Sequence, residues 1–517
     1  MKATNKYLSI GLITLLILGA IGCSDFLDKQ PLGQVHEGTA PAGGIGSKVN
    51  KIYGLTRSYN ITAGIPAFLI HMVRSEDSEK GSDLTDGADQ AEFFDNFVYH
   101  ANNGSVKAYW NHNYKIIVEA NDVIASLKDQ NLEDLTIEEK ANLGEAYFFR
   151  AFCFFNMVRA FGEVPKIDFP VETVEDGNIP KSPVEDIYEL IDHDLSSIVD
   201  NELLPVKWKA SSDIGRLTYG AARALQARTF MMRNDWPKML SAAEDVIGLG
   251  VYDLKTPYDQ IFTEKGEYSS ESVFELGCLS TPARPSDNAI GSQFCEVQGV
   301  RGTPNLGWGW HMATKELGEA YESGDPRKDA TLLYFRRSVD EPITELNSNK
   351  PDGESPVSTA MGAYFNKKAY VSPSERSSYT SNSGKWVNIR LIRYADVVLM
   401  AAEASNELGK LDSALKYLEE VRARARGGND KILPEITKNS IGGDVAELRK
   451  KIHYERRIEL ALEPDRFYDL VRWGTAKEVL SKAGKTNYEP RHRYIPIPQD
   501  IIDQSGGILI QNPDYSN

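Results

Sequence analysis

The sequence predicts a mainly α-helical protein made of packed helix hairpins, with little β-structure. In residues 394–425, apolar side chains recur at helical spacing on both sides of a break at Gly409, which is typical of two antiparallel helices. Residues 215–247 repeat this pattern in the same register. The matching positions are Tyr219, Ala227, Trp236 and Leu240 in the first hairpin, and Tyr394, Ala402, Leu411 and Leu415 in the second. A period near ~34 residues favours a tetratricopeptide-type scaffold, in which stacked hairpins bury each other's faces.

The N-terminus predicts a targeting segment. Lys2 and Lys6 precede a short apolar run, Leu8–Ile21, that ends just before Cys23. Such a run is a poor membrane span and is typical of a signal peptide, so residues 1–22 are expected to be removed. The small residues before Cys23 resemble a lipidation signal, and a lipid there would anchor the protein to a membrane without spanning it. The alternative is cleavage elsewhere, which leaves Cys23 a free thiol.

The composition indicates a folded acidic protein. Hydrophobic residues make up 41% of the 517 positions, and the formal net charge is -16. Nucleic-acid phosphates repel such a charge, so we expect no nucleic-acid partner. Cys278 and Cys295 are the only plausible disulfide pair, while Cys153 lies in an apolar helix where a buried thiol is expected. No His and Cys cluster suggests a metal, and no cofactor is predicted.

Three further helices are expected in the first half, after a flexible start. Residues 24–50 are rich in Gly, Pro and Ala and predict a tether. Trp110–Leu127 is expected to be a helix whose tryptophan faces the core. Ala146–Pro165 is apolar nearly all round, which predicts a central buried helix that ends at Gly162. Asp186–Val199 predicts an amphipathic helix.

An acidic stretch, Arg74–Asp95, has two interpretations. Its many carboxylates are typical of a solvated loop, and their spacing does not match a calcium-binding EF-hand. Carboxylates also form hydrogen bonds with sugar hydroxyls, so the stretch is alternatively the edge of a ligand site.

Residues 251–385 are expected to form a loop-rich insert. Gly, Pro, Ser and Asn become frequent there, and long ordered loops often carry function. In Gly299–His311, glycines flank Trp308 and Trp310 and would let the backbone hold their indole faces open to solvent. Exposed aromatic planes beside polar groups suit the apolar faces of sugars. We therefore predict that Trp308 and Trp310 contact ligand; the alternative is that both fill the scaffold.

A helix near the C-terminus places two carboxylates on an apolar face. Glu455 and Glu459 share this face with Leu448, Ile452 and Leu462. Two glutamates four residues apart repel each other, so burying them requires neighbouring cations. A paired-carboxylate catalytic site is one interpretation. Nearby arginines favour a structural ion-pair network instead, namely Arg456, Arg457, Arg466 and Arg472.

Several motifs together resemble one family. They are HYERRIELALEPDRFYDLVRWG from His453, YADVVLMAAEASNELG from Tyr394, and YIPIP followed by QNPDY from Tyr494. In this order they resemble the C-terminal signature of the SusD/RagB family of nutrient-binding outer-membrane lipoproteins. Pro464 departs from the pattern, because the family usually has Gly there.

The resemblance implies ligand capture without catalysis. It implies one SusD-like domain over residues 23–517, with 23–250 and 386–517 as helical scaffold. It also implies an outer-membrane lipoprotein, facing the cell exterior, that binds an oligosaccharide or polysaccharide and passes it to a SusC-like TonB-dependent transporter. Ligand contacts are implied in the acidic stretch and the loop after it, at Arg74, Asp77, Asp83, Tyr99, Asn102 and Asn103.

Three alternatives remain open. RagB-like members imply capture of peptides, and the acidic stretch would then favour basic ones. A glycosidase would use two carboxylates, but the sequence has none of the common catalytic motifs for a nucleophile, a metal or a nucleotide. A protein-interaction scaffold is the third class, because helix hairpins often serve that role.

Overall fold

The computed structural model describes residues 44–515, apart from 282–287, 289, 304–306, 334, 337–344, 347–354, 357–363, 372 and 377–383. The predicted signal peptide, Cys23 and most of the predicted tether therefore lie outside the described residues.

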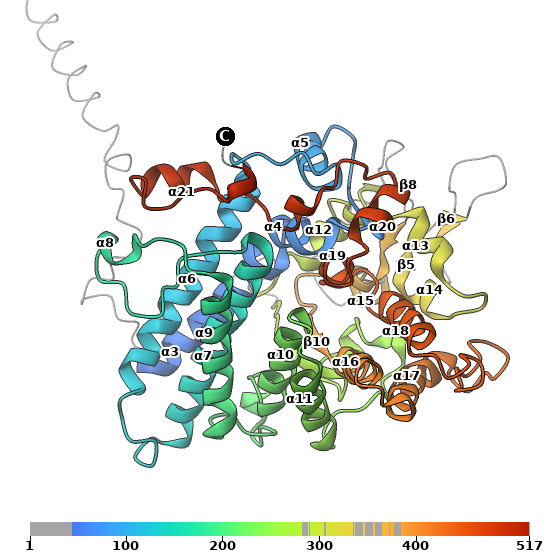
Figure 1. The fold of residues 1–517 in the computed structure, drawn as a ribbon, viewed down its shortest axis with the longest axis horizontal. Coiled ribbons are helices and arrows are strands. Elements are labelled where there is room, and N and C mark those ends of the chain that lie inside the picture. Colours follow the sequence, from blue (N-terminus) through green and yellow to red (C-terminus); the bar gives the residue numbers. More distant parts are fainter. Residues whose placement is uncertain are drawn as a thin grey trace, which may run out of the picture.

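The fold is mainly helical, as predicted, and its long helices stand in one row across the molecule (Figure 1). Each helix of the row packs on the next, in the order α3 (Gly44–Thr56), α6 (Gly104–Leu127), α7 (Ile137–Phe161), α9 (Val184–Asp200), α10 (Tyr219–Met232), α11 (Trp236–Gly248), α16 (Tyr394–Glu407), α17 (Leu411–Arg426) and α18 (Val445–Glu459).

Shorter helices connect and cover this row. The α-helical ones are α4 (Ile65–Phe68), α5 (Ala88–Gln90), α8 (Val174–Gly177), α12 (Phe294–Gln298), α13 (Lys315–Ala320), α14 (Arg327–Thr331), α15 (Pro373–Arg376), α19 (Arg466–Arg472), α20 (Ala476–Lys482) and α21 (Gln499–Gln504). The π-helical turns among the described residues are η1 (Tyr59–Ala63), η2 (Leu69–Val73) and η3 (Ala91–Asp95). The 3₁₀ turns are η4 (Ser211–Asp213), η5 (Tyr258–Gln260), η6 (Glu264–Gly266), η7 (Lys367–Ala369), η8 (Pro490–Arg493) and η9 (Pro513–Tyr515).

Helix α7 is the buried centre of the N-terminal half, as its apolar sequence predicts. Thr136 and Glu139 form a reciprocal capping box at its start, which satisfies two free backbone donors. Every residue in 141–161 is buried, including Cys153. The helix ends at Gly162, whose φ of 77° favours glycine and whose missing side chain leaves room for the ring of Tyr494.

The two predicted hairpins are confirmed, with the predicted register. Tyr219 and Tyr394 each begin the first helix of a hairpin, and Trp236 and Leu411 each begin the second. Helices α11 and α16 pack together, although more than a hundred residues separate them in the chain. The apolar core is continuous across both hairpins, which is how stacked hairpins bury each other's faces.

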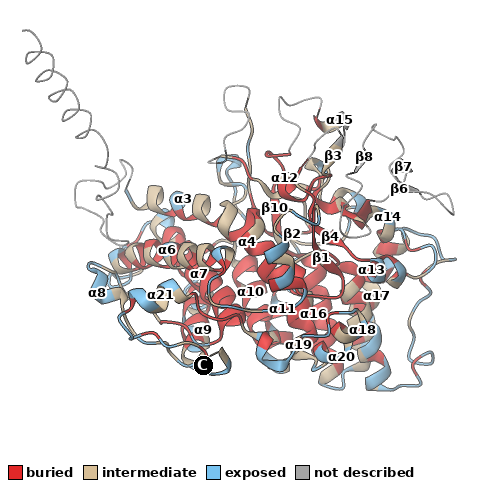
Figure 2. Cartoon of the chain, turned by 90° about the horizontal axis from the view of Figure 1, so that it is seen from above, coloured by how far each residue is buried: buried red, intermediate tan, exposed pale blue. Residues whose placement is uncertain are grey.

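The described strands are short and form five antiparallel pairs. The pairs are β1 (Ser78–Gly81) with β4 (Trp310–Ala313), β2 (Ser272–Leu276) with β10 (Ile389–Arg393), β3 (Gly302–Thr303) with β8 (Ser355–Pro356), β5 (Leu332–Leu333) with β9 (Phe365–Asn366), and β6 (Phe335–Arg336) with β7 (Glu345–Leu346). Figure 2 shows most of these strands gathered at one end, on the side away from α9 and α19.

Two expectations meet the structure differently. The predicted tether ends early, because residues from Gly44 onward already form α3, whose Val49 and Ile52 are buried. Cys278 and Cys295, the plausible disulfide pair, are both free thiols. Among the described residues, no helix has the length and apolar character needed to cross a membrane.

Candidate functional site

Strand pairing brings together the two segments in which the sequence predicts ligand contacts. Gly81 of β1 lies opposite Trp310 of β4, so the acidic turn after β1 rests against the segment before β4. Arg301 donates from Nη1 to Ser82 Oγ at 2.7 Å and forms an ion pair with Asp86. Charge-assisted hydrogen bonds of this kind fix the turn against its neighbour.

Trp308 lies half-buried on this part of the surface. Gly307 has no space for a side chain, because a Cβ there would lie 2.3 Å from the carbonyl oxygen of Glu296. Gly309 has a φ of 71°, which also favours glycine. The two glycines thus let the chain bend sharply on either side of the indole. The ring of Tyr59 lies 6.1 Å from that of Trp308, so the two form a small aromatic platform.

Charged groups border this platform. The side chains of Arg301 and Asp86 are 36% and 37% exposed. Burial raises the pKa of Tyr59 to about 12, so its hydroxyl stays a neutral donor at ordinary pH. We call Tyr59, Asp86, Arg301 and Trp308 together the Trp308 surface. It offers aromatic rings beside both hydrogen-bond donors and acceptors, the arrangement that sugar rings require.

Trp310 has a different environment from Trp308. It is only 6% exposed and belongs to the main apolar core. Lys80 lies over its ring, with Nζ 4.8 Å from the centroid, and donates to the backbone oxygen of Asp83. At Gly87, a Cβ would come within 2.7 Å of the ring. Trp310 therefore holds the acidic turn in place and presents little surface to a ligand.

Arg74 and Asp77 are buried with internal partners. Arg74 is fully buried, donates to Ile70 O at 2.8 Å and to Tyr468 Oη at 3.2 Å, and lies 4.1 Å from the ring of Phe467. Asp77 is 2% exposed and accepts from Nε of Arg457 at 2.9 Å. Neither side chain offers surface to a ligand, and both join distant parts of the chain.

The interpretation of the acidic stretch as a solvated loop is wrong for three of its carboxylates. Glu76, like Asp77, is buried and paired with Arg466. Asp95 is buried beside Lys485, with Nζ 3.3 Å from its Oδ1. These three carboxylates instead form ion pairs with Arg457, Arg466 and Lys485, and so attach the acidic stretch to the C-terminal part of the chain.

Of the other implied ligand contacts, Asp83 lies in the acidic turn, and Tyr99, Asn102 and Asn103 lie in or next to the loop before α6. Asp83 is half-buried in the turn beside Asp86, where its Oδ1 accepts from the backbone of Thr85 at 2.9 Å. Tyr99 packs on the ring of Phe93 at 4.6 Å and on His492, away from this turn. Asn102 is exposed, and Asn103 caps the start of α6. Of the four, Asp83 is the one that shares the turn with the Trp308 surface.

The paired glutamates of α18 lie in a buried ion-pair network. Glu455 and Glu459 are fully buried, and their carboxylates accept from four arginines of other elements. These are Arg327, Arg393, Arg422 and Arg424, and not the four arginines that follow in sequence. Burial raises the pKa of Glu459, but Arg424, Arg393 and Arg327 outweigh it and hold the pKa below its ordinary value. A carboxylate held ionised among arginines and away from solvent suits stability, not acid–base chemistry.

Among the described residues, no group of three His, Cys, Asp or Glu side chains is placed to hold a metal ion.

Comparison with known proteins identifies the family. A family model described as "SusD family" matches residues 288–515, and a second, described as "Starch-binding associating with outer membrane", matches residues 25–231. SusD-like protein P2 of Formosa agariphila is 28% identical, over 97% of this chain and 98% of the relative. The chain belongs to the SusD-like family.

Solved SusD-like structures share the fold of this SusD-like protein. A "Laminarin binding SusD-like protein" superimposes with a TM-score of 0.73 at 25% identity, over 91% of this chain and 99% of that one. Surface glycan-binding protein A from Bacteroides thetaiotaomicron, solved with laminarihexaose, gives 0.74 at 25% identity, over 90% and 98% of the two chains. The predicted fold class is thus confirmed.

Proposed function

We propose that this SusD-like protein captures a glycan at the cell surface and delivers it to a SusC-like TonB-dependent transporter. The observation that carries the proposal is the Trp308 surface. A half-buried indole, a second aromatic ring and an exposed ion pair stand together there on a rigid scaffold. Such a surface binds a sugar through its C–H face and its hydroxyls. Its carboxylate, Asp86, is paired with Arg301, whereas a glycosidase uses a pair of carboxylates.

The comparisons support a glycan as the ligand class. Two of the similar structures are named for laminarin binding or were solved with laminarihexaose. The acidic stretch supports peptide capture less, because three of its carboxylates are already neutralised internally by arginine or lysine. We therefore place glycan binding ahead of binding of basic peptides.

The N-terminal segment supports the proposed location. A lipid on Cys23 would tether the protein to the outer membrane by a chain of about twenty residues before α3 begins. The description of one matching family model also names the outer membrane.

Isothermal titration calorimetry tests the function. The full chain, purified in a detergent without a sugar headgroup, would be titrated with laminarin, starch and a mixture of basic peptides. We expect saturable binding of at least one polysaccharide and no binding of peptides, and chromatography of the recovered polysaccharide should show no shortening.

Other results would replace the proposal. Binding of peptides alone would favour the peptide-capturing alternative, and shortening of a bound polysaccharide would favour a glycosidase. No binding to any of these ligands would favour a protein-interaction scaffold.

A further inference from the structure

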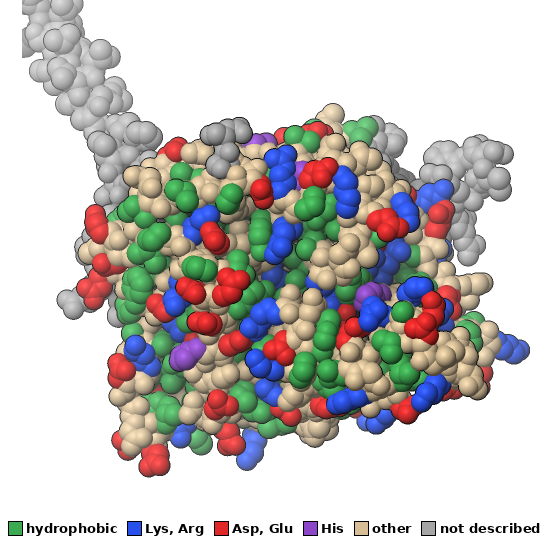
Figure 3. Space-filling view, in the orientation of Figure 1, with side chains coloured by type: hydrophobic (Ala, Val, Ile, Leu, Met, Phe, Trp, Pro, Cys, Tyr) green, Lys and Arg blue, Asp and Glu red, His purple; other side chains and the backbone are tan. Residues whose placement is uncertain are grey.

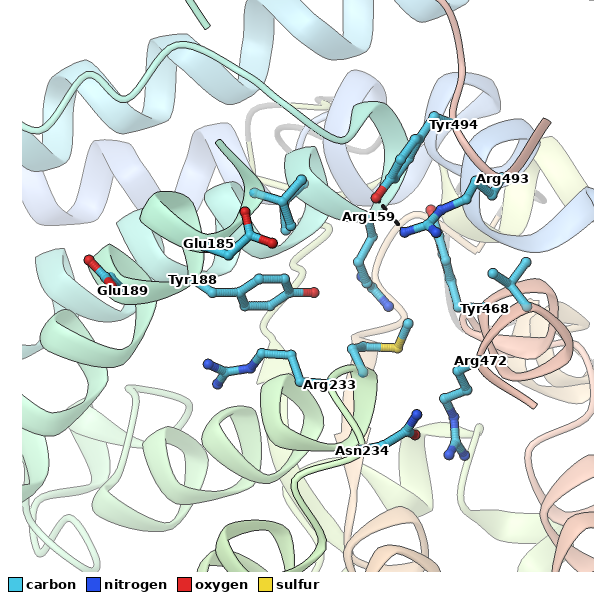
Figure 4. Close-up of a pocket in the computed structure, with 14 residues that line it drawn as sticks. Arg159, Glu185, Tyr188, Glu189, Arg233, Asn234, Tyr468, Arg472, Arg493 and Tyr494 are labelled. Atoms are coloured by element: carbon cyan, nitrogen blue, oxygen red, sulfur yellow. Dashed lines mark hydrogen bonds between the residues drawn. The ribbon is translucent and has the colours of Figure 1, made fainter. Parts of the chain in front are cut away.

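A pocket of about 480 Å³ lies on another face of the molecule from the Trp308 surface. Its walls come from the C-terminal ends of α7 and α10, the first turns of α9, helix α19, and the segment at Arg493 (Figure 4). In Figure 2, α9 and α19 lie on the lower side of the molecule, while α12 and β3, which precede Trp308 in sequence, lie on the upper side. Figure 3 looks onto the pocket's face and shows basic side chains along its middle.

One basic group of the pocket is held rigidly. Arg159 is 7% exposed and forms an ion pair with Asp465. Its guanidinium lies 4.0 Å from the ring of Phe155 and 4.5 Å from that of Tyr468. Stacking and ion pairing together fix the donor before any ligand arrives, which lowers the entropy cost of binding.

Two further donors face Arg159 across the pocket. Figure 4 shows Tyr188 reaching in from one side and Arg493 from the other, with Arg159 between them. Within the described part of the chain, the hydroxyl of Tyr188 has no hydrogen-bond partner and Arg493 has no carboxylate partner. Among the residues that the structure describes, Arg493 donates to Tyr494 Oη alone, at 2.5 Å. Burial raises the pKa of Tyr188 to about 12, so the hydroxyl remains a donor. Tyr188 and Arg493 therefore give the pocket two donors, and the exposed Arg493 adds a positive charge without a counter-ion among the described residues.

Two acidic side chains also line the pocket. Glu185 and Glu189 stand on the exposed side of α9, one turn apart, and both line the pocket. Neither has an ion-pair partner among the residues that the structure describes. Their carboxylates accept hydrogen bonds, which hydroxyl groups of a ligand would supply.

We propose that this pocket is a second site that binds a uronic acid, a sugar that carries a carboxylate. Arg493, Tyr188 and Arg159 receive the carboxylate, and Glu185 and Glu189 accept from the ring hydroxyls. A neutral sugar leaves Arg493 without a counter-ion, and a carboxylate without hydroxyls leaves the glutamates without donors. The volume is within the range of pockets that enclose small ligands. The site is independent of the Trp308 surface and does not rest on the proposed function of that surface.

Ligand-observed NMR of the full chain in the same kind of detergent tests the proposal. The probes are D-glucuronate, D-glucose and N-acetyl-L-glutamate. D-glucose has the same ring without the carboxylate, and N-acetyl-L-glutamate carries carboxylates but no hydroxyls. We expect saturable binding of glucuronate, at least about tenfold tighter than that of either other probe. Arg493→Gln and Tyr188→Phe should each weaken glucuronate binding about tenfold or more.

Two control variants show whether glucuronate binds in this pocket. Arg491→Gln removes the same charge two residues away, outside the pocket, and should leave glucuronate binding unchanged. Trp308→Ala should also leave it unchanged, because that residue lies elsewhere. Absence of glucuronate binding would overturn the proposal. Equal binding of N-acetyl-L-glutamate would also overturn it, because the pocket would then recognise carboxylates of peptides as well as those of sugars. Loss of glucuronate binding in Trp308→Ala would overturn it too, because glucuronate would then bind at the Trp308 surface.

Discussion

Replacing Glu459 by glutamine is expected to lower the free energy of unfolding by about 3–5 kcal/mol. The carboxylate of Glu459 is fully buried and accepts from Arg424 at 2.6 Å, from Arg393 at 3.0 Å and from Arg327 at 3.2 Å. Glutamine has nearly the same shape but no charge, so the variant buries arginines with too little negative charge. The cost comes from this uncompensated positive charge and not from lost packing.

Urea unfolding followed by circular dichroism measures this cost, and Glu447→Gln is the matched control on the same helix. Glu447 pairs with Lys450 at 2.6 Å, but the two side chains are 49% and 70% exposed. Exposed pairs contribute only about 0–1 kcal/mol, so Glu447→Gln should unfold almost like the unaltered protein. Adding Arg424→Met to Glu459→Gln should restore part of the stability, because it removes the excess positive charge from the network, while Glu271, the other partner of Arg424, keeps its bond from Arg393. Equal stability of the two glutamine variants would contradict the structural role of the network.

Replacing Trp310 by alanine is expected to destabilise the fold by about 3–5 kcal/mol, the cost of removing a buried tryptophan. The ring lies in the main core, with Lys80 above it and the turn at Gly87 against its edge. Its loss leaves a cavity and removes the surface on which the acidic turn rests. We therefore expect reduced stability first, and weaker glycan binding only as a consequence.

Unfolding and glycan titration of the same variant separate these two effects. Trp308→Ala serves as the comparison, because its half-buried ring should cost far less stability than Trp310. If Trp310→Ala unfolds like the unaltered protein and yet loses glycan binding, then Trp310 is a ligand contact and its placement in the core is wrong.

The helical scaffold was largely predictable from sequence, because its signals are local. Periodic apolar residues, a break at Gly409 and the stop at Gly162 each act within a few residues, and the structure has a helix or a helix end at each. The shared register of the two hairpins also follows from short-range pattern. What these signals lack is information on which helices become neighbours.

The site was predicted only in part, because its residues meet through long-range pairing. Trp308 was found from its flanking glycines, and Asp86 lay within the predicted acidic stretch. Tyr59 and Arg301 were missed, since nothing near either in sequence marks it as a partner of Trp308. Strands β1 and β4, of four residues each, bring the acidic stretch beside the segment of Trp308, and strands this short show no clear pattern in sequence.

The predicted ligand contacts at Arg74 and Asp77 were inferred for charged residues that turn out to be buried. Arg74 and Asp77 look like surface residues because charged side chains are seldom fully buried without partners. Their partners are far away in sequence: Arg457 lies 380 positions from Asp77, and Tyr468 lies 394 positions from Arg74. Without those partners in view, burial was not predictable.

The most direct test of glycan capture at the Trp308 surface is calorimetry of Trp308→Ala against Trp236→Ala. Trp236 is also half-buried, but it begins α11 on the helical row and is not part of the Trp308 surface. With a polysaccharide that binds the unaltered protein, Trp308→Ala should weaken binding about tenfold or more, which is about 1.4 kcal/mol. Trp236→Ala should bind as the unaltered protein does. Equal affinity of the two variants would contradict the assignment of the site to the Trp308 surface.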